Sequence, residues 1–425
     1  FMDVLIDLFA VLFLGVVTIY TGSWALMYNR RTLLARRSHE HQQELLRAQI
    51  DLIADRRRME REKTDLSWNG FRKFEVHRKQ IEADGVCSFY LAPHDRKDLP
   101  PFEPGQFLTF DLPVPGQPKN IIRCYSLSDS PNHPDYYRVS IKRVPPPRDQ
   151  PDLPPGLSSN YFHDNLEEGD ILDVKAPSGH FYLDMSSHMP VVLIGGGVGL
   201  TPVLSMLNAI VEAGSQRETH FFYGVVNGKD HAFKEHLHQI ALENQNVHLH
   251  VCYSKPADDD VLGEDFQHDG RVGVPLFKEL LDSNNYEYYL CGPPPMMNSV
   301  VGDLGEWGVP EKNIHFEAFG PASVKKPKDD APADPAATSV SYEVSFARSN
   351  KKVTWTPEAG SLLELAEDNG INAINSGCRA GNCGSCITAI KKGEVDYVNE
   401  PGSPPEDGSC HACITVPKSN MEIDA

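Results

Sequence analysis

The chain has 425 residues, of which 40% are hydrophobic and 23% are charged. This length allows about two to four domains, and this composition excludes a chain that is disordered throughout. Lys and Arg number 40 against 59 Asp and Glu, a net charge of −19, so a nucleic-acid-binding protein is excluded. Five of the nine Cys lie from Cys378 onward. Such clustering favours a metal site in a reducing compartment over an extracellular disulfide scaffold.

The first segment is a run without charge from Leu8 to Met27. At about 1.5 Å per residue it spans about 30 Å, the thickness of a bilayer core. Trp24 lies near its end and arginines follow from Arg30, so the positive-inside rule places the rest of the chain in the cytoplasm. A signal peptide would need a basic start and a shorter apolar stretch, and a buried core helix is the second alternative. We therefore predict a single-pass anchor at residues 1–31, with the lipid bilayer of a bacterial inner membrane as its partner.

Residues 32–66 are predicted to form a charged helical stalk. The segment contains no Pro, and Leu45, Leu52 and Met59 recur every seven residues on one face. Three interpretations stay open: a helix packed on its own domain or on the membrane surface, a stalk that forms a homodimer, and a docking helix for a partner. About two and a half heptads are too few to choose among them.

Residues 67–185 alternate short apolar runs with Pro and Gly turns. Residues 107–112 and 136–141 have the composition of strands, and regular short strands over such a length predict a small antiparallel β-barrel. The first folded domain is therefore expected to be all-β.

Two motifs in this region carry residue types that bind a flavin nucleotide. An Arg with small hydroxyl groups can hold a pyrophosphate, and a Tyr beside them can lie flat against a flavin ring. A helix that begins with small residues offers its backbone N–H groups to phosphate. An ordinary strand with a surface Arg is the alternative. The candidate residues are Arg123, Tyr125, Ser126 and Ser128 in the strand, and Ser158 and Ser159 at the start of the helix.

Residues 186–321 alternate strands and helices, which predicts an α/β nucleotide-binding domain. The apolar run at residues 191–194 predicts a buried parallel strand, and a glycine-rich loop follows it directly. Glycines there let the backbone approach a pyrophosphate, and Thr201 is the expected N-cap of the next helix. Leu200 stands where the full dinucleotide fingerprint has its third Gly. The candidate residues are Gly195, Gly196, Gly197, Gly199 and Thr201.

Three motifs follow one another in the barrel region: Arg-Cys-Tyr-Ser-Leu-Ser-Asp-Ser at 123–130, Gly-Leu-Ser-Ser-Asn-Tyr-Phe-His-Asp at 156–164 and Ala-Pro-Ser-Gly-His-Phe at 176–181. In this order they resemble the ferredoxin–NADP reductase superfamily, and most closely the reductase half of flavohaemoglobins. The resemblance covers about residues 73–321. It implies FAD in the barrel, with FMN as the alternative that related oxygenase reductases use. It also implies that Arg123 and Ser159 contact the flavin phosphates, and that Tyr125 and Ser126 lie on the isoalloxazine side.

The resemblance further implies which residues face the nicotinamide. Cys291, Gly292 and Pro293 match the family's segment beneath the nicotinamide. Phe319 takes the place of the aromatic ring that covers the flavin, and Glu317 is implied to support hydride or proton transfer. Two alternatives stay open, namely Cys291 as a small buried residue and Glu317 as a structural hydrogen-bonding carboxylate.

We expect NADH rather than NADPH as the electron donor. A domain that binds NADPH usually places Arg or Lys where the 2′-phosphate lies. After its second strand this domain offers only Lys229, which stands beside Asp230, and Lys255 is the second candidate.

Residues 322–339 are rich in Pro, Ala, Lys and Asp, which predicts a flexible linker. The last domain, residues 340–425, begins with alternating apolar residues at 342–346 and continues with a predicted helix at 361–369. We expect an α+β domain with a β-grasp-like fold.

The last domain carries the most specific motif of the chain. Cys378, Cys383 and Cys386 have the C-x₄-C-x₂-C spacing of a plant-type [2Fe–2S] site. Zinc is the alternative, because Cys410 and Cys413 form a C-x₂-C pair. The short run and Pro after Cys413 resemble plant-type ferredoxins, so we choose Cys413 as the fourth ligand and expect Cys410 to be a bystander.

Together these segments predict a membrane-anchored electron-transfer flavoprotein. NADH would give FAD two electrons as a hydride, and the cluster would take them one at a time. The anchor suggests a membrane-associated acceptor, such as an oxygenase, hydroxylase or desaturase. Three further functions stay open: a respiratory-type subunit that delivers electrons to quinone or cytochrome, a reductase of a hybrid-cluster or nitric-oxide-handling protein, and a membrane scaffold with inactive cofactor sites.

Overall fold

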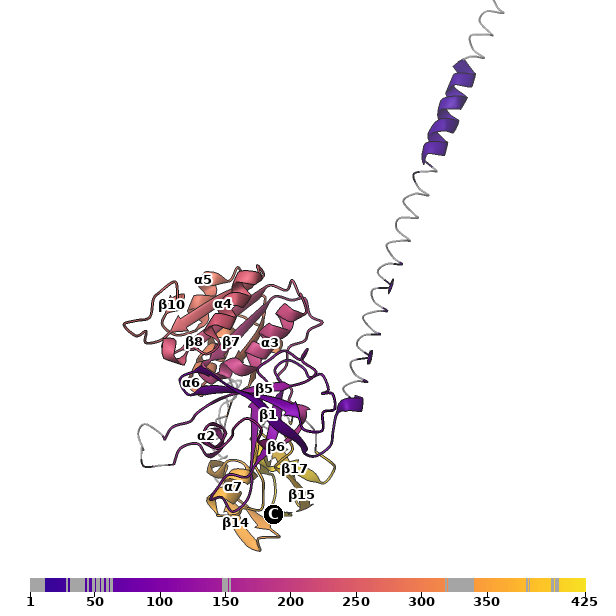
Figure 1. Cartoon of the computed structure of the whole chain (residues 1–425). Helices are drawn as coiled ribbons and strands as arrows, with labels where there is room; N and C mark the ends of the chain where they lie inside the picture. Colours follow the sequence, from indigo (N-terminus) through magenta and orange to yellow (C-terminus); the bar gives the residue numbers. More distant parts are fainter. Residues whose placement is uncertain are drawn as a thin grey trace, which may run out of the picture. The chain divides into compact units, whose positions relative to one another are not determined.

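The computed structural model divides the chain into two compact units, Phe1–Asp65 and Leu66–Ala425 (Figure 1). Continuous stretches are described at residues 12–27, 64–146, 154–317, 340–379, 383–398 and 405–425, with single residues or pairs between them.

The first unit is helical at residues 12–27 and at every position described between 30 and 65. Ile19 and Trp24 are among the large apolar side chains that it exposes. Among the described residues, no helix is both long enough and apolar enough to cross a membrane. Residues 8–11 of the predicted anchor lie outside the described residues, as do the stalk residues Leu45, Leu52 and Met59.

The second unit begins with the predicted antiparallel β-sheet, here called the barrel domain. Its strand order is β4-β3-β6-β1-β2-β5. A bridge between Leu127 and Val139 joins the two ends of the sheet, so the sheet curls around an apolar core that includes Phe89 and Phe110. The elements are β1 (Arg72–Ala83), β2 (Val86–Pro93), β3 (Phe107–Leu112), β4 (Ile121–Ser126), β5 (Tyr137–Lys142), α2 (Leu157–Asp164) and β6 (Ile171–Ser178).

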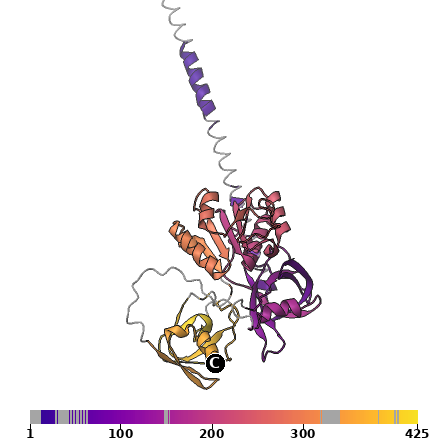
Figure 2. The ribbon, with the colours of Figure 1, turned by 90° about the vertical axis from the view of Figure 1, so that its left-hand side faces the viewer.

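The next domain is a parallel α/β sheet with the order β10-β9-β8-β7-β11-β12. Helices α3 and α4 cover one face and α5 and α6 the opposite face, each pair over its own apolar core (Figure 2). The strand order reverses at β7, where open α/β sheets bind ligands beyond the carboxyl ends of their strands. The elements are β7 (Val191–Gly196), α3 (Leu200–Glu212), β8 (Thr219–Val225), α4 (Lys234–Glu243), β9 (Val247–Tyr253), β10 (His268–Asp269), α5 (Val274–Leu280), β11 (Glu287–Cys291), α6 (Pro294–Glu306) and β12 (Ile314–Glu317).

Helix α3 begins earlier than expected, and the prediction that Thr201 caps it is wrong. A 3₁₀ turn over Gly197–Gly199 runs straight into the helix, so Gly199 is the N-cap. Thr201 therefore lies inside the first turn, where its hydroxyl donates to the Val198 carbonyl at 3.1 Å.

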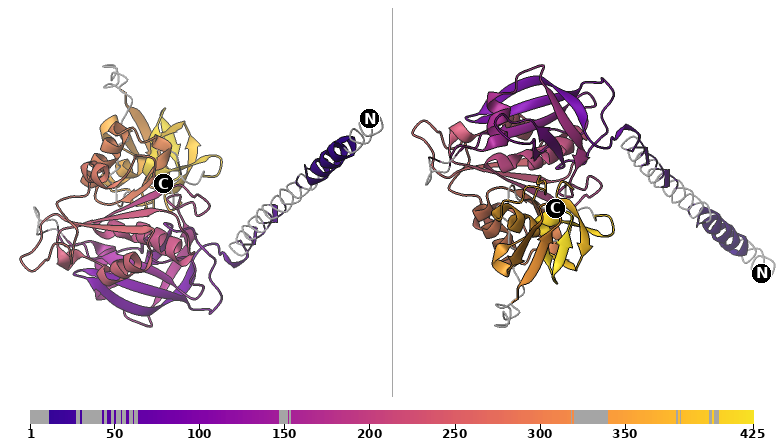
Figure 3. Two further views of the ribbon diagram at one scale, coloured as in Figure 1. Left: turned by 90° about the horizontal axis from the view of Figure 1, so that it is seen from above. Right: turned by 90° about the horizontal axis from the view of Figure 1, so that it is seen from below.

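The last domain is drawn in orange to yellow in Figure 3. It is built on a mixed sheet with the order β14-β13-β19-β15-β17, in which β13 and β19 are parallel. Helix α7 begins at a capping box between Ser361 and Glu364 and packs on the sheet through Leu362 and Leu365. This arrangement confirms the α+β prediction. The elements are β13 (Tyr342–Phe346), β14 (Lys351–Trp355), α7 (Leu362–Asp368), β15 (Ile387–Lys392), β16 (Val395–Tyr397), β17 (Ser409–His411), β18 (Thr415–Pro417) and β19 (Met421–Ile423).

Candidate active site

A cavity of about 360 Å³ is lined by residues from all three domains of the second unit. The barrel domain supplies one wall, the glycine loop and the end of β12 supply another, and the loop that carries Cys378 supplies a third. Residues far apart in the sequence therefore meet at one site. The predicted site residues on its wall are Arg123, Tyr125, Ser126, Ser158, Ser159, Thr201, Glu317, Phe319 and Cys378.

Strand β4 presents a cation and an anchored aromatic ring to the cavity. Arg123 is half-buried, and its guanidinium donates to the Ile122 carbonyl at 2.7 Å. Burial lowers the pKa of Arg123 from its ordinary value. The Tyr125 hydroxyl donates to Ser158 Oγ at 3.0 Å, and the ring packs edge-on against Phe162 with centroids 5.1 Å apart. Contacts with the barrel core thus hold the Tyr125 ring in a defined position.

The start of helix α2 lies on the cavity wall, and the sequence predicts that phosphate binds there. Gly156 precedes the helix, and a side chain there would come within 2.9 Å of Ser159 Oγ. Ser159 Oγ in turn accepts from the Val144 backbone N–H at 3.3 Å. Small residues thus leave the positive end of the helix open toward the cavity, and Arg123 lies on the same wall. A helix N-terminus beside a cation is an environment that suits a diphosphate.

Ser128 does not lie in the cavity, contrary to its predicted role. It is fully buried, with its Oγ 2.8 Å from Ser140 Oγ and 3.2 Å from the Nε of Arg138. The position just past the end of β4 turns its side chain into this internal hydrogen-bond network. Its hydroxyl therefore serves the barrel domain rather than a ligand.

The glycines of the loop after β7 have two different tasks. Side chains at Gly195, Gly196 or Gly199 would collide with α3 or with the segment after β11, for example at 2.6 Å from Met296 Sδ for Gly196. These three glycines therefore allow close packing. Gly197 has a φ of +54° and no described atom within 4 Å of an added Cβ, so this position leaves open space for a dinucleotide.

The segment Cys291, Gly292 and Pro293 lies against this loop, at the end of β11. Cys291 is fully buried and pairs with Gly195 across the sheet, and it does not line the cavity. Burial raises the pKa of its thiol well above the ordinary value. The structure thus supports the alternative in which Cys291 is a small buried residue.

Glu317 and Phe319 reach the cavity from the end of β12. Glu317 Oε2 is buried and has no hydrogen-bond partner among the described residues. Burial raises the pKa of this carboxyl to about 8, so the group is mostly protonated at neutral pH. A protonated carboxyl on the cavity wall can donate a hydrogen bond to a polar group of a ligand. Phe319 lies beside it with 39% of its surface exposed.

Four cysteines gather in two pairs in the last domain. The backbone N–H of Cys378 donates to Cys383 Sγ at 3.2 Å, and that of Cys383 donates to Cys378 Sγ at 3.3 Å. The Sγ atoms of Cys386 and Cys413 lie 3.1 Å apart. Cys410 is instead fully buried on β17 and belongs to the domain core. Two thiol pairs fit a [2Fe–2S] cluster, which takes four thiolates.

Residues that the sequence did not single out also shape the cavity, among them Lys142 and Arg379. Lys142 Nζ pairs with Asp230 at 2.8 Å, so it bridges the barrel domain and the nucleotide domain. Arg379 lies next to the cysteine Cys378 and pairs with Glu367. Lys142 stands in no recognisable motif, because its role depends on a contact between separate domains. Arg379 lies inside the C-x₄-C spacing, but its place on the cavity wall depends on the folded chain.

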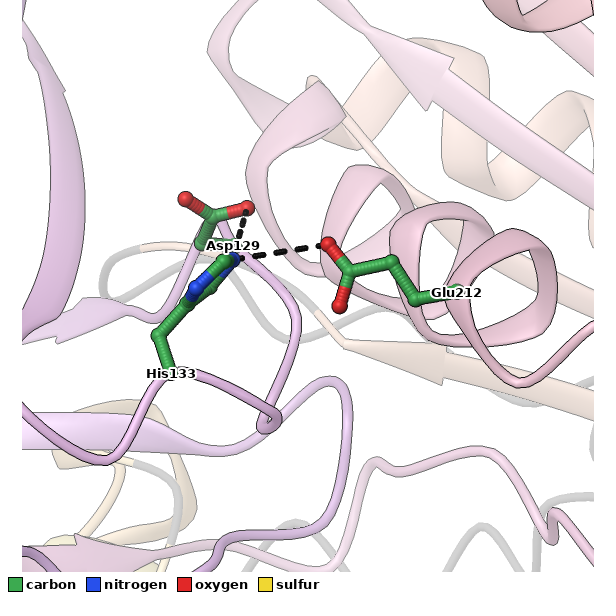
Figure 4. A group of neighbouring side chains, drawn as sticks. All are labelled: Asp129, His133 and Glu212. Atoms are coloured by element: carbon green, nitrogen blue, oxygen red, sulfur yellow. Dashed lines mark ion pairs between the residues drawn. The ribbon is translucent and has the colours of Figure 1, made fainter.

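Asp129, His133 and Glu212 form a polar cluster between the barrel domain and α3 (Figure 4). His133 Nε2 lies 3.4 Å from Glu212 Oε1 and 3.9 Å from Asp129 Oδ1. The Arg138 guanidinium lies 3.3 Å from the same Asp129 oxygen, and Asn208 Nδ2 donates to it at 3.0 Å. Because a cation and an amide already satisfy Asp129, we interpret the cluster as a contact between domains.

Three protein families match this chain. The Oxidoreductase FAD-binding domain matches residues 73–182, the Oxidoreductase NAD-binding domain residues 193–302, and the 2Fe-2S iron-sulfur cluster binding domain residues 347–418. Together with the cavity and the cysteine pairs, they define an NAD(P)H-dependent flavoprotein oxidoreductase that binds FAD and a [2Fe–2S] cluster. A scaffold with inactive cofactor sites is therefore excluded.

Comparison with individual proteins identifies a family within this class of oxidoreductases. The FAD/NAD-binding domain of nitric oxide dioxygenase from Vibrio cholerae is 33% identical with a TM-score of 0.53, over 59% of this chain and 100% of that one. This chain therefore belongs to the flavohaemoprotein-like family of FAD/NAD-binding reductases. The flavohemoprotein of Halalkalibacterium halodurans is 40% identical over 255 residues, which are 60% of this chain and 61% of that protein. The chain thus spans about three fifths of the length of the curated relatives it matches.

One solved structure matches a larger part of this chain than the flavohaemoprotein-like proteins do. Phthalate dioxygenase reductase, a modular structure for electron transfer from pyridine nucleotides to [2Fe–2S], is 26% identical with a TM-score of 0.51. The match covers 84% of this chain and 98% of that one. It extends the similarity beyond the flavohaemoprotein-like part to the last domain.

Proposed function

We propose that this protein takes electrons from NADH and delivers them singly, through FAD and the [2Fe–2S] cluster, to a membrane-associated oxygenase, hydroxylase or desaturase. The observation that supports this path is a cavity whose wall includes the flavin-binding strand, the nucleotide domain and the cluster-bearing loop. FAD, when bound, accepts a hydride and releases electrons one at a time.

The chain's own residues position this chemistry. Arg123 and the start of α2, with Ser159, would hold the flavin phosphates. Tyr125 would contact the flavin ring, and Phe319 would cover the ring and move to admit the nicotinamide. Glu317 would donate a hydrogen bond from its protonated carboxyl, because burial keeps its pKa at about 8.

The domain order of phthalate dioxygenase reductase favours an oxygenase-type acceptor. A nitric-oxide-handling partner is the second candidate, because the reductase part also resembles that of a nitric oxide dioxygenase. In either case the acceptor would meet the last domain, which carries the cluster.

We also propose that residues 1–31 anchor the protein in a membrane with the remaining domains in the cytoplasm. The support is the uncharged run from Leu8 to Met27, the arginines after it, and the exposed apolar helix at residues 12–27. Tethering would raise the effective concentration of the cluster near a membrane acceptor. Homodimer formation through the stalk stays a prediction.

Removal of residues 1–65 is expected to leave NADH-to-dye activity nearly unchanged, because the second unit contains the whole cavity. Electron delivery to native membranes should fall at least about tenfold at low protein concentration, since the truncated protein is no longer concentrated near its membrane acceptor. The rates of NADH oxidation with dye and with membranes measure this difference.

In the full chain, Ile19→Glu should act like the truncation, and the matched Ile19→Leu should not. Equal delivery by all forms would contradict the anchor, and loss of flavin on truncation would contradict the domain boundary near residue 66.

Residues at the carboxyl ends of β8 and β9 support a preference for NADH over NADPH. Asp260 accepts from the Gly228 backbone N–H at 3.2 Å and from that of Ala257 at 2.7 Å, so a carboxylate joins the two loops where the adenosine half is expected. Lys229 and Lys255 are exposed at this edge. The fixed negative charge would oppose a 2′-phosphate.

We expect a higher kcat/KM for NADH than for NADPH, with a dye as acceptor. Asp260→Asn should raise the NADPH-to-NADH ratio of kcat/KM several-fold, because it removes the opposing charge. Asp259→Asn removes an exposed neighbouring charge and is the control. A wild-type preference for NADPH would reverse the assignment and make Lys229 or Lys255 the partner of the phosphate.

A further inference from the structure

We propose that Asp129 is a positioning residue for hydride transfer, because it ties helix α3 of the nucleotide domain to the end of strand β4 of the barrel domain. The proposal rests on the proposed transfer from NADH to FAD. In that step a C–H bond of the dihydronicotinamide ring breaks, and a hydride, one proton with two electrons, passes to FAD. NADH is thereby oxidised to NAD⁺ and FAD is reduced, so the two rings must meet in a defined geometry.

Asp129 stands between the two segments that are expected to hold the reactants. It follows closely after β4, which places Tyr125 on the cavity wall. Helix α3 begins directly after the 3₁₀ turn over Gly197–Gly199, and Val198 of that turn lines the same cavity. A contact between Asp129 and α3 therefore fixes the dinucleotide loop relative to the strand that is expected to hold the flavin.

Two side chains of α3 bind Asp129. Ser205 Oγ donates to the Asp129 backbone carbonyl at 2.7 Å, and Asn208 Nδ2 donates to Asp129 Oδ1 at 3.0 Å. Ser205 and Asn208 are both buried, and the other residues at 202–210 of this helix are apolar. A buried polar side chain costs free energy unless it is hydrogen-bonded, so these two bonds favour a single placement of α3.

The barrel domain holds the Asp129 carboxylate from its own side. The buried Arg138 guanidinium lies 3.3 Å from Oδ1, the Ser130 backbone N–H donates to Oδ1 at 3.0 Å, and the Tyr136 hydroxyl donates to Oδ2 at 3.2 Å. The carboxylate would therefore remain paired if α3 lost its two donors. Substitutions in α3 can thus release the contact between the domains without leaving a buried charge alone.

Two further ionic contacts between these domains are more exposed. His133 with Glu212, and Lys142 with Asp230, are pairs of partly exposed side chains (Figure 4 shows the first pair). Ion pairs that water reaches contribute little. The buried contact at Asp129 is therefore the one that we expect to decide how the two domains are aligned.

The test is the rate at which NADH reduces the flavin of the full chain, measured by anaerobic stopped-flow absorbance over a range of NADH concentrations. Ser205→Ala combined with Asn208→Leu removes both donors and keeps residue types that favour a helix. We expect the limiting rate of flavin reduction to fall about fivefold to a hundredfold, since a misplacement of about 1 Å can cost about a hundredfold.

Two further readouts separate alignment from binding. The charge-transfer absorbance of the complex between nicotinamide and flavin should weaken in the double variant, because it requires the two rings to stack. The NADH concentration that gives half the limiting rate should change less than about threefold, because the glycine loop itself is intact.

Thr219→Val is the matched control, because it also replaces a buried polar side chain of the nucleotide domain by an apolar one. The Thr219 hydroxyl donates to the Arg217 carbonyl at 3.0 Å, so its bond stays inside that domain. The limiting rate of this variant should stay close to that of the wild type. An unchanged limiting rate in the double variant would overturn the proposal, as would an equal fall in Thr219→Val.

If the double variant does not retain FAD, Asn208→Leu alone is compared with Thr219→Val and decides in the same way. A wild-type flavin that NADH does not reduce would refute the proposed function, and with it this proposal. A wild-type flavin that NADH reduces, at the same limiting rate as in the double variant, would refute only the role of Asp129.

Discussion

Cys413→Ser is expected to abolish the visible absorption of the [2Fe–2S] cluster and to leave FAD in place. Cys413 Sγ lies 3.1 Å from Cys386 Sγ, so this pair would hold one iron while Cys378 and Cys383 hold the second. Loss of one thiolate leaves an iron under-coordinated. The barrel and nucleotide domains supply two of the three walls of the cavity and all of the predicted flavin-binding residues, so NADH-to-dye activity should persist. Visible spectra and iron content of the purified variants measure the effect.

Cys410→Ser is the matched control, because it makes the same substitution three residues away. Cys410 is fully buried on β17, opposite Thr388 of β15. Its thiol belongs to neither of the two cysteine pairs, so the cluster absorption should remain. If Cys410→Ser loses the cluster absorption and Cys413→Ser keeps it, Cys410 is the fourth ligand and the assignment from the sequence is wrong.

Arg123→Ala is expected to weaken FAD binding about 10- to 100-fold. A charge-assisted hydrogen bond to phosphate is worth about 1.5–3 kcal/mol, and each 1.4 kcal/mol is about tenfold in the dissociation constant. The half-buried guanidinium lies on the cavity wall with Ser159 and the start of α2, and β4 carries no second cation to replace it. Flavin fluorescence during dialysis measures retention, and mass spectrometry of the released flavin identifies it.

Arg143→Ala is the control for this prediction. Arg143 pairs with Asp164 at the far end of α2, at 2.6 Å, and does not line the cavity. Its loss should leave flavin binding nearly unchanged, because an exposed ion pair contributes little. Equal flavin loss in both variants would mean that stability of the barrel domain, rather than phosphate contact, explains the result. Release of FMN from the wild type would contradict the choice of FAD.

Local patterns predicted most of the fold. The strand at residues 107–112 agrees with β3, and the predicted helix at 361–369 agrees with α7 after Ser361. Strand periodicity, a capping box and a glycine-rich turn each act within about a dozen neighbouring residues, so their consequences are visible in the sequence. The exact start of α3 was missed because the 3₁₀ turn at Gly197–Gly199 extends the helix, and no residue type marks such a turn.

For the site as well, the sequence predicted the features that depend only on residues close together in the chain. The C-x₄-C-x₂-C spacing, the Arg–Cys–Tyr–Ser strand and the loop at Gly195–Gly199 identify cofactor classes from the sequence alone, because each motif surrounds its ligand locally. That Ser128 turns into a buried network, and that the loop at Gly377 lies against Ile122 of β4, required the folded chain. These contacts join residues of different domains or strands, and they arise from the packing of whole cores, which no local spacing encodes.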